Sequence, residues 1–346
     1  MKIAGFELGK GKTMIVAELS ANHGHDLEIA KRTIRAAKQA GADAIKLQTY
    51  TPDTLTIDCR KDDFVLNHGT LWDGRTLYEL YGEAYTPWGW HEELCRTARE
   101  EGLICFSSPF DKTAVDFLEQ FRVPAYKIAS FEITDIPLIE YAARKGKPMI
   151  MSTGIATRQE LEDAVNACRR VGNNDIILLK TSSQYPAAYE DANLAMIRDM
   201  AERFGVMTGL SDHTEGWLVP ALSVPAGAVM IEKHFILDKS IGGPDAAFSL
   251  DKDQFAEMVR KVREAEKIYG KVDYSLTEKA KNSRVFARSL YVVKDMKKGE
   301  VFTEENLRSI RPGYGMPPKF LPEILGKRAA RDIRKGTRME WDLVEK

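Results

Sequence analysis

The sequence predicts an α/β fold, a TIM (β/α)8 barrel followed by a small C-terminal domain. Eight apolar segments alternate with eight amphipathic ones between residues 14 and 269, which is the count and size of such a barrel. Polar residues stand at or just past the ends of most apolar segments, and the alternation stops after Gly270. An open doubly wound sheet would show the same alternation, so the position of the polar residues decides for the barrel.

Each element of the barrel follows from local composition. After a hairpin expected to turn near residues 9–11, short apolar strands are predicted at 14–18, 44–48, 103–107, 125–129, 148–152, 175–180, 206–210 and 228–235. Helical spacing of apolar residues predicts helices at 26–40, 88–101, 112–120, 135–145, 157–171, 191–203, 216–223 and 251–269. Asp26 suits the N-cap of the first helix, and a polar, aromatic insertion occupies residues 51–87.

Polar side chains mark one end of almost every predicted strand. They are Glu18, Lys46, Gln48, Ser107, Ser108, Lys127, Ser152, Thr153, Ser182, Ser183, Ser211, Asp212, His213, Glu232, Lys233 and His234. A closed barrel would gather all of them at its carboxyl face, where TIM-barrel enzymes keep their active sites. An open sheet would spread them along an edge.

The pattern past Gly270 predicts a second, smaller domain. We expect residues 1–270 to form the barrel, 271–282 a polar linker, and 283–346 a compact domain of short strands and turns. From Ser283 onward there are 7 Lys and 8 Arg against 3 Asp and 6 Glu, a net charge of +6 that leaves −7 for the rest. This basic excess predicts that the domain docks on the barrel or on an anionic ligand.

Composition excludes several classes of protein. With 50 Lys and Arg against 51 Asp and Glu, the chain is not expected to bind nucleic acid. Cys59, Cys95, Cys105 and Cys168 show no CxxC spacing and are expected to be reduced thiols. No apolar run reaches the 18 or so residues of a membrane span, and the first residues lack a signal-peptide pattern. We therefore expect a cytoplasmic protein without a membrane partner.

Two histidines are the candidate metal ligands. Ser211 and His213 share one face of an extended strand, and Glu232 and His234 share one face of the next. A lone histidine would more often be a packed core residue, but two at matching strand ends indicate a common function. No cysteine lies nearby to complete a structural zinc site, so His213 and His234 predict an open site for Mn²⁺, Mg²⁺ or Co²⁺.

Two lysines should point into the barrel mouth. Lys46 and Lys127 there require an anion or a carbonyl, and they could equally be paired with neighbouring carboxylates or form a Schiff base with substrate. The hydroxyl-rich segments 152–154 and 181–183 could donate hydrogen bonds to a phosphate, although serine and threonine also form ordinary turns. Neither GxxxxGK[ST] nor GxGxxG occurs, so scattered hydroxyls and lysines would hold the phosphate.

Nine motifs in this order resemble the sialic acid synthase family over nearly the whole chain. They are AELSANHG (17–24), KLQT (46–49), FSSPFD (106–111), AYKIAS (125–130), MSTG (151–154), LSDHT (210–214), EKHF (232–235), GGPD (242–245) and RPG (311–313). Segments 81–88, 110–118, 130–148 and 244–250 look most like the family members that make pseudaminic acid. Sialic acid synthases tend to carry PDHKAS where this chain has PDAAFS, which disfavours N-acetylmannosamine as substrate.

The resemblance implies a fold, an assembly and a reaction. It implies a TIM barrel followed by an antifreeze-like (SAF) domain, in a domain-swapped homodimer. Phosphoenolpyruvate would condense with an amino-sugar aldose, 2,4-diacetamido-2,4,6-trideoxy-L-altrose, to give pseudaminic acid and phosphate. Synthesis of N-acetylneuraminic or legionaminic acid is the near alternative. A lysine Schiff-base aldolase and a non-catalytic carbohydrate-binding protein are the distant ones.

The resemblance also implies roles for individual residues. The resemblance implies that phosphate is held by Lys127, Ser130, Ser152, Ser211 and Ser183. At the position of Ser183 the family often has Asn. Lys46, Gln48 and Ser108 would lie near the carboxylate of phosphoenolpyruvate, and His213 and His234 would bind the metal. Glu18, Tyr185 and Asp245 would lie at the substrate, and Arg311 of the partner subunit would reach the sugar amide. A metal that polarises the aldehyde would assist the weak enol nucleophile, and either the metal or Glu232 would activate water.

Overall fold

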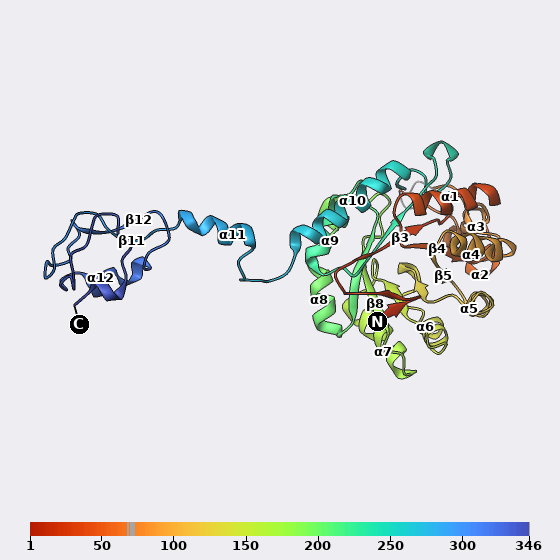
Figure 1. The fold of residues 1–346 in the computed structure, drawn as a ribbon. Coiled ribbons are helices and arrows are strands. Elements are labelled where there is room, and N and C mark those ends of the chain that lie inside the picture. Colours follow the sequence, from red (N-terminus) through yellow and green to blue (C-terminus); the bar gives the residue numbers. More distant parts are fainter. Residues whose placement is uncertain (68, 70–72, 346) are drawn as a thin grey trace. The chain divides into compact units, whose positions relative to one another are not determined.

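The computed structural model describes residues 1–67, 69 and 73–345. Contacts divide the chain into two compact units, Met1–Gly270 and Lys271–Lys346. In the first unit, eight parallel strands close into a barrel in the order β10-β3-β4-β5-β6-β7-β8-β9 (Figure 1). The sheet is therefore closed, and the TIM barrel predicted from the position of the polar residues is confirmed.

The barrel strands are short and almost wholly buried, as their apolar composition predicts. They are β3 (Met14–Glu18), β4 (Ala44–Thr49), β5 (Ile104–Pro109), β6 (Tyr126–Ile128), β7 (Met149–Ser152), β8 (Ile176–Thr181), β9 (Met207–Asp212) and β10 (Met230–His234). Pairing of β10 with β3 closes the ring and sets His234 opposite Glu18.

Helices follow the strands and cover the outside of the barrel (Figure 1). They are α1 (Leu27–Gln39), α4 (His91–Glu100), α5 (Lys112–Glu119), α6 (Ile136–Ala143), α7 (Arg158–Arg170), α8 (Ala195–Phe204), α9 (Leu218–Ala226) and α10 (Lys252–Tyr269). Side-chain caps begin several of them. Asp26, Asp111 and Asp251 each accept hydrogen bonds from the backbone N–H groups of the following turn. The predicted cap at Asp26 is confirmed.

The predicted amino-terminal hairpin forms, but its position was wrong. Strands β1 (Lys2–Ile3) and β2 (Phe6–Glu7) pair antiparallel, so the chain turns at Ala4 and Gly5 and not near residues 9–11. Both turn residues adopt positive φ, and Gly5 takes φ +87° without a Cβ penalty. Ile3 and Leu8 then pack with Met14 and Phe106 in the core inside the barrel, so the hairpin closes its amino-terminal end.

The predicted insertion at residues 51–87 contains the short helices α2 (Pro52–Leu55) and α3 (Leu77–Ala84). The second unit contains α11 (Glu278–Ser283), β11 (Ser289–Val292), β12 (Leu307–Ile310) and α12 (Leu321–Ile324). Helix α11 lies in a stretch expected to be a plain polar linker, where Thr277 caps it. Leu290, Phe302 and Met339 belong to this unit's own apolar core. No helix in the described part of the chain is long and apolar enough to cross a membrane.

Candidate active site

Four charged side chains from four strands meet inside the barrel, near its carboxyl end. They are Glu18, Lys46, Lys127 and Glu232, which we call the carboxylate–lysine cluster, and each is at most 4% exposed. Lys46 Nζ lies 2.5 Å from Glu18 Oε2 and 3.4 Å from Glu232 Oε1. Lys127 Nζ lies 3.2 Å from the same Glu232 oxygen. Both lysines are thus paired with carboxylates, one of the alternatives that the sequence left open.

Burial and mutual attraction compete within this cluster. Burial lowers the pKa of Lys127 to about 8, although Glu232 opposes the shift. Burial would also lower the pKa of Lys46, but the carboxylates of Glu18 and Glu232 outweigh it and raise that pKa. Burial raises the pKa of Glu18 to about 7, whereas Lys127 and Lys46 overcome burial at Glu232 and lower its pKa. Glu232 is therefore an anion at neutral pH, and Glu18 is poised to exchange a proton.

A group of serine hydroxyls surrounds Gly154, just beyond β7. Gly154 N–H donates to Ser130 Oγ at 3.2 Å, and a Cβ built on Gly154 would overlap Ser183 Oγ. In the described chain, Ser152 Oγ and Ser183 Oγ are buried without a hydrogen-bond partner. Because a buried hydroxyl without a partner is costly, these two oxygens indicate a polar ligand. Ser211 is engaged differently, since its Oγ donates to Glu232 Oε1 at 3.2 Å.

His213 and His234 come together at the rim, with ring centroids 5.3 Å apart. Burial lowers the pKa of His213 to about 4 and that of His234 well below its usual value, so both rings are neutral at pH 7. His213 Nδ1 lies 2.8 Å from the carbonyl oxygen of Ser182, which it fits as a donor and which leaves Nε2 for a ligand. Among the described residues, His234 Nδ1 is buried without a hydrogen-bond partner.

The two imidazoles suit a metal with other ligands from outside the protein. Over residues 1–67, 69 and 73–345, no group of three or more His, Cys, Asp or Glu side chains is arranged to hold an ion. Asp212, adjacent to His213, instead forms a buried ion pair with Lys233 at 2.5 Å. Paired neutral imidazoles with an open coordination sphere fit Mn²⁺, Mg²⁺ or Co²⁺ better than a closed structural zinc site.

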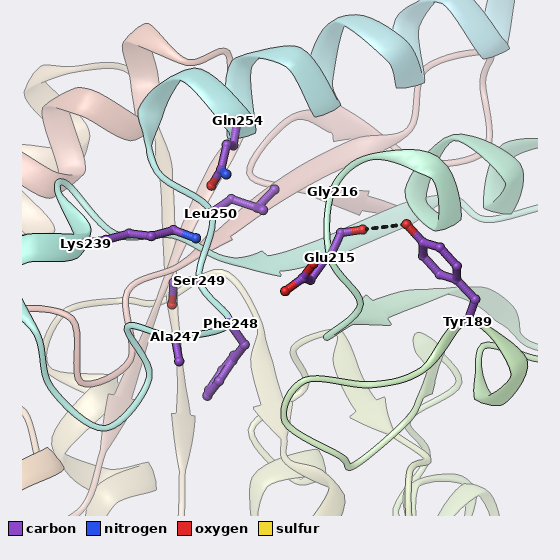
Figure 2. A pocket seen from close by; sticks show the side chains of 9 residues that line it. All are labelled: Tyr189, Glu215, Gly216, Lys239, Ala247, Phe248, Ser249, Leu250 and Gln254. Atoms are coloured by element: carbon purple, nitrogen blue, oxygen red, sulfur yellow. Dashed lines mark hydrogen bonds between the residues drawn. The ribbon is translucent and has the colours of Figure 1, made fainter. Parts of the chain in front are cut away.

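Aromatic rings pack against the imidazoles. Tyr185 lies 4.4 Å from His213 between ring centroids, and Phe248 lies 5.0 Å from His234. Phe248 also borders a hollow of about 370 Å³ beside the site, together with Lys239, Glu215 and Gln254 (Figure 2). The sequence analysis marked segment 244–250 as a departure from sialic acid synthases and placed Asp245 at the substrate, but it gave Phe248 no role. The structure shows that this segment supplies a wall of the histidine site.

The remaining predicted residues divide between the two units. Gln48 Nε2 donates to Ser20 Oγ at 2.9 Å and to Glu18 Oε1 at 3.3 Å, and Ser108 Oγ accepts from Lys46 at 3.4 Å. Asp245 Oδ2 lies 3.6 Å from His234 Nδ1. These side chains therefore border the cluster or the histidines. Arg311 belongs to the second unit and follows β12.

Glu132 is a candidate functional residue that the sequence analysis missed. Its Oε2 is buried without a hydrogen-bond partner in the described chain, and burial raises its pKa to about 7. Asp135 raises this pKa further, whereas Lys127 and Lys46 of the cluster lower it. The motif SFEIT contained the only signal, an acidic residue two positions after Ser130.

Glu132→Gln is expected to make the protein more stable at pH 8 and to leave its stability unchanged at pH 4. Because the folded-state pKa lies above the ordinary value, the unfolded chain ionises first, and stability is lost between about pH 4.5 and pH 7. Glutamine carries no such penalty, so the free energy of unfolding at pH 8 should rise by about 1–3 kcal/mol. Urea unfolding at both pH values measures this, with the exposed Glu202→Gln as control. A pH dependence identical to that of the parent protein would refute the prediction.

Comparison with known proteins agrees with this geometry. The sequence profile of the NeuB family matches residues 33–274, and that of the SAF domain matches residues 287–345. A pseudaminic acid synthase of Campylobacter jejuni is 53% identical over 97% of each chain. An N,N'-diacetyllegionaminic acid synthase of Legionella pneumophila is 35% identical, over 96% of this chain and 94% of that protein. The solved structure of a Bacillus subtilis spore coat polysaccharide biosynthesis protein has a TM-score of 0.67 at 33% identity, covering 100% of this chain and 99% of its own. The chain therefore belongs to the NeuB family and ends in a SAF domain, which confirms the resemblance in its motifs.

Proposed function

We propose that the protein is a pseudaminic acid synthase, which condenses phosphoenolpyruvate with 2,4-diacetamido-2,4,6-trideoxy-L-altrose and releases phosphate. The observation that carries this proposal is the meeting, in one barrel mouth, of two lysines, a group of buried hydroxyls and two neutral imidazoles. The 53% identity to the Campylobacter jejuni enzyme, against 35% to the legionaminic acid synthase, supports the choice of sugar.

The serines around Gly154 would bind the phosphate of phosphoenolpyruvate. Ser152 and Ser183 have hydroxyls to donate, and Ser130 borders the same space. Lys127 would add its positive charge from β6. Ser211 would join them by turning its hydroxyl from Glu232. Lys46, Gln48 and Ser108 would hold the carboxylate end. Cations already desolvated and fixed in place stabilise developing negative charge without further reorganisation.

His213 and His234 would hold a divalent metal, Mn²⁺, Mg²⁺ or Co²⁺. Bound there, the metal would supply Lewis-acid polarisation of the sugar aldehyde. Burial keeps both imidazoles in the neutral form that a metal requires, and Phe248 and Tyr185 restrict the rotation of their rings. Within that site, Asp245 and Glu18 would contact the sugar, and Tyr185 would border it.

Glu232 would accept a proton from the attacking water. In the ligand-free cluster its pKa is low because Lys127 and Lys46 stabilise the carboxylate. An anionic substrate would share those two lysines, so the basicity of Glu232 would rise when phosphoenolpyruvate binds. Binding of phosphoenolpyruvate would thereby make Glu232 a stronger base.

We also propose that the protein works as a domain-swapped homodimer in which Arg311 of the partner subunit approaches the sugar amide.

Incubation with phosphoenolpyruvate, Mn²⁺ and each candidate sugar tests this function. We expect inorganic phosphate and a nine-carbon product from the altrose derivative, because segment 244–250 differs from the sialic acid synthase pattern. Mixing the sugars in competition measures kcat/KM ratios directly. A preference for N-acetylmannosamine or for the legionaminic acid precursor would overturn the substrate assignment. Trapping of pyruvate on Lys127 by borohydride would overturn the reaction class.

A further inference from the structure

Two cysteines outside the active site lie in contact. Cys95 on α4 and Cys105 on β5 have their sulfur atoms 3.5 Å apart. Side chains alternate along β5, so Phe106 points into the barrel core while Cys105 faces the helices. The two residues belong to different elements, yet only ten positions separate them in the chain. No pairing of this kind was expected from the sequence, where the four cysteines seemed unrelated in spacing.

Both thiols line a hollow of about 360 Å³ that is separate from the active site. Ala4 and residues 102–104 also line it, and these residues lie at the start of β5 and at the amino-terminal hairpin. The hollow therefore lies toward the amino-terminal end of the barrel, opposite the carboxyl-end cluster. A small solute can reach the sulfur atoms without entering the catalytic mouth.

The charges around this hollow favour a reactive sulfur. Arg99 and Arg122 line it, and within the described part of the chain neither guanidinium forms an ion pair. Either thiol can donate a hydrogen bond to the other sulfur. This shared hydrogen bond lowers the pKa of Cys95 and, with burial, raises the pKa of Cys105. Arg99 lowers the pKa of Cys95 further. Cys95 lies one helical turn before Arg99 on α4, so we expect it to be the sulfur that ionises first.

We propose that Cys95 and Cys105 are a dithiol that a small peroxide, entering through this hollow, oxidises to a disulfide within the folded barrel. The Cys95 thiolate attacks one peroxide oxygen, an S–O bond forms, the O–O bond breaks, and the departing hydroxide takes up a proton to become water. The sulfur of Cys105 then attacks the Cys95 sulfur, and the S–O bond breaks. A second water leaves with the proton of Cys105.

The reaction balances, and the two sulfur atoms already lie in contact. Two thiols lose two electrons and two protons, and one hydrogen peroxide becomes two waters. The sulfur atoms must approach from 3.5 Å to a bond length of about 2.05 Å. The bond would fasten α4 to the strand that carries Ser108 at its other end. This inference does not depend on the proposed function.

Peroxide treatment of the native full-length protein tests the proposal. After a small excess of hydrogen peroxide at neutral pH, we expect titratable thiols to fall from four to two and the intact mass to fall by two hydrogens. Trypsin separates the two cysteines into fragments 76–96 and 100–112, so a peptide joining these fragments identifies the bond. Dithiothreitol should release them.

Single substitutions of the cysteines and of Arg99 test which residues the reaction requires. Cys95→Ser and Cys105→Ser should each abolish the joined peptide, whereas Cys59→Ser, the matched control, should leave it unchanged. Arg99→Gln should slow thiol loss several-fold, because the thiolate loses a nearby cation. Four thiols persisting after treatment, a bond that involves Cys59 or Cys168, or a sulfinic acid at Cys95 without a bond would each overturn the proposal. If a serine variant fails to fold, the presence or absence of the joined peptide in the wild-type protein still tests the proposal.

Discussion

His234→Ala is expected to lower kcat of the condensation by on the order of 10³-fold or more while the protein stays folded. The imidazole is buried and neutral, and its Nδ1 makes no hydrogen bond within the described structure. Its loss removes one of two proposed metal ligands, together with the ring contact to Phe248 and the approach of Asp245 Oδ2 to Nδ1 at 3.6 Å. His213→Ala should act similarly, although it also frees the carbonyl oxygen of Ser182.

The measurement pairs activity with metal binding. Mn²⁺ titration of the chelator-treated protein should show a site in the parent that is absent from His234→Ala, and circular dichroism should show the same fold. His25→Ala is the control, because His25 is an exposed imidazole whose Nε2 lies 2.8 Å from the carbonyl oxygen of Glu83. Full turnover by chelator-treated His234→Ala, or an unchanged Mn²⁺ isotherm, would end the metal proposal.

Lys46→Met should cause the largest loss of stability among single changes in the barrel mouth. Lys46 lies between two buried carboxylates, 2.5 Å from Glu18 and 3.4 Å from Glu232. Removing it leaves the Glu232 carboxylate with Lys127 as its remaining cation, and it forces Glu18, whose pKa is already about 7, to take up a proton at neutral pH. Breaking a buried pair in this way costs about 3–5 kcal/mol of unfolding free energy. We also expect loss of turnover, because the substrate carboxylate loses its cation.

Urea unfolding at pH 7 measures this loss, and a second substitution shows its origin. Lys38→Met is the control, since that exposed lysine donates one hydrogen bond, to the carbonyl oxygen of Gly102. The double variant Lys46→Met/Glu18→Gln should recover part of the lost stability, because the amide needs neither a cation nor a proton from solvent at pH 7. A single variant within 1 kcal/mol of the parent, on the scale of an exposed pair, would contradict the buried-pair account.

Local sequence was enough for the elements and for the direction of many side chains. The two-residue period of a strand puts Glu232 and His234 on one face and turns Lys233 to the other, where it pairs with Asp212. Helix starts such as Asp26 could be identified because N-capping depends on neighbouring residues alone. The hairpin turn was misplaced because Gly9 and Gly11 also adopt positive φ, so glycine position did not distinguish the turn.

Tertiary structure alone decided which groups meet. Glu18 and His234 become register partners only when β10 pairs with β3 and closes the barrel. The same closure brings Glu232 of β10 to Lys46 and Lys127, whereas Lys46 meets Glu18 through the pairing of β3 with β4. Glu132 escaped notice because its burial and the approach of Lys46 from β4 arise only in the folded barrel. The sequence by itself determined what each strand presents to the interior, since side-chain direction is a local property. Which of those groups come within bonding distance depends on barrel closure and register, which no local segment specifies.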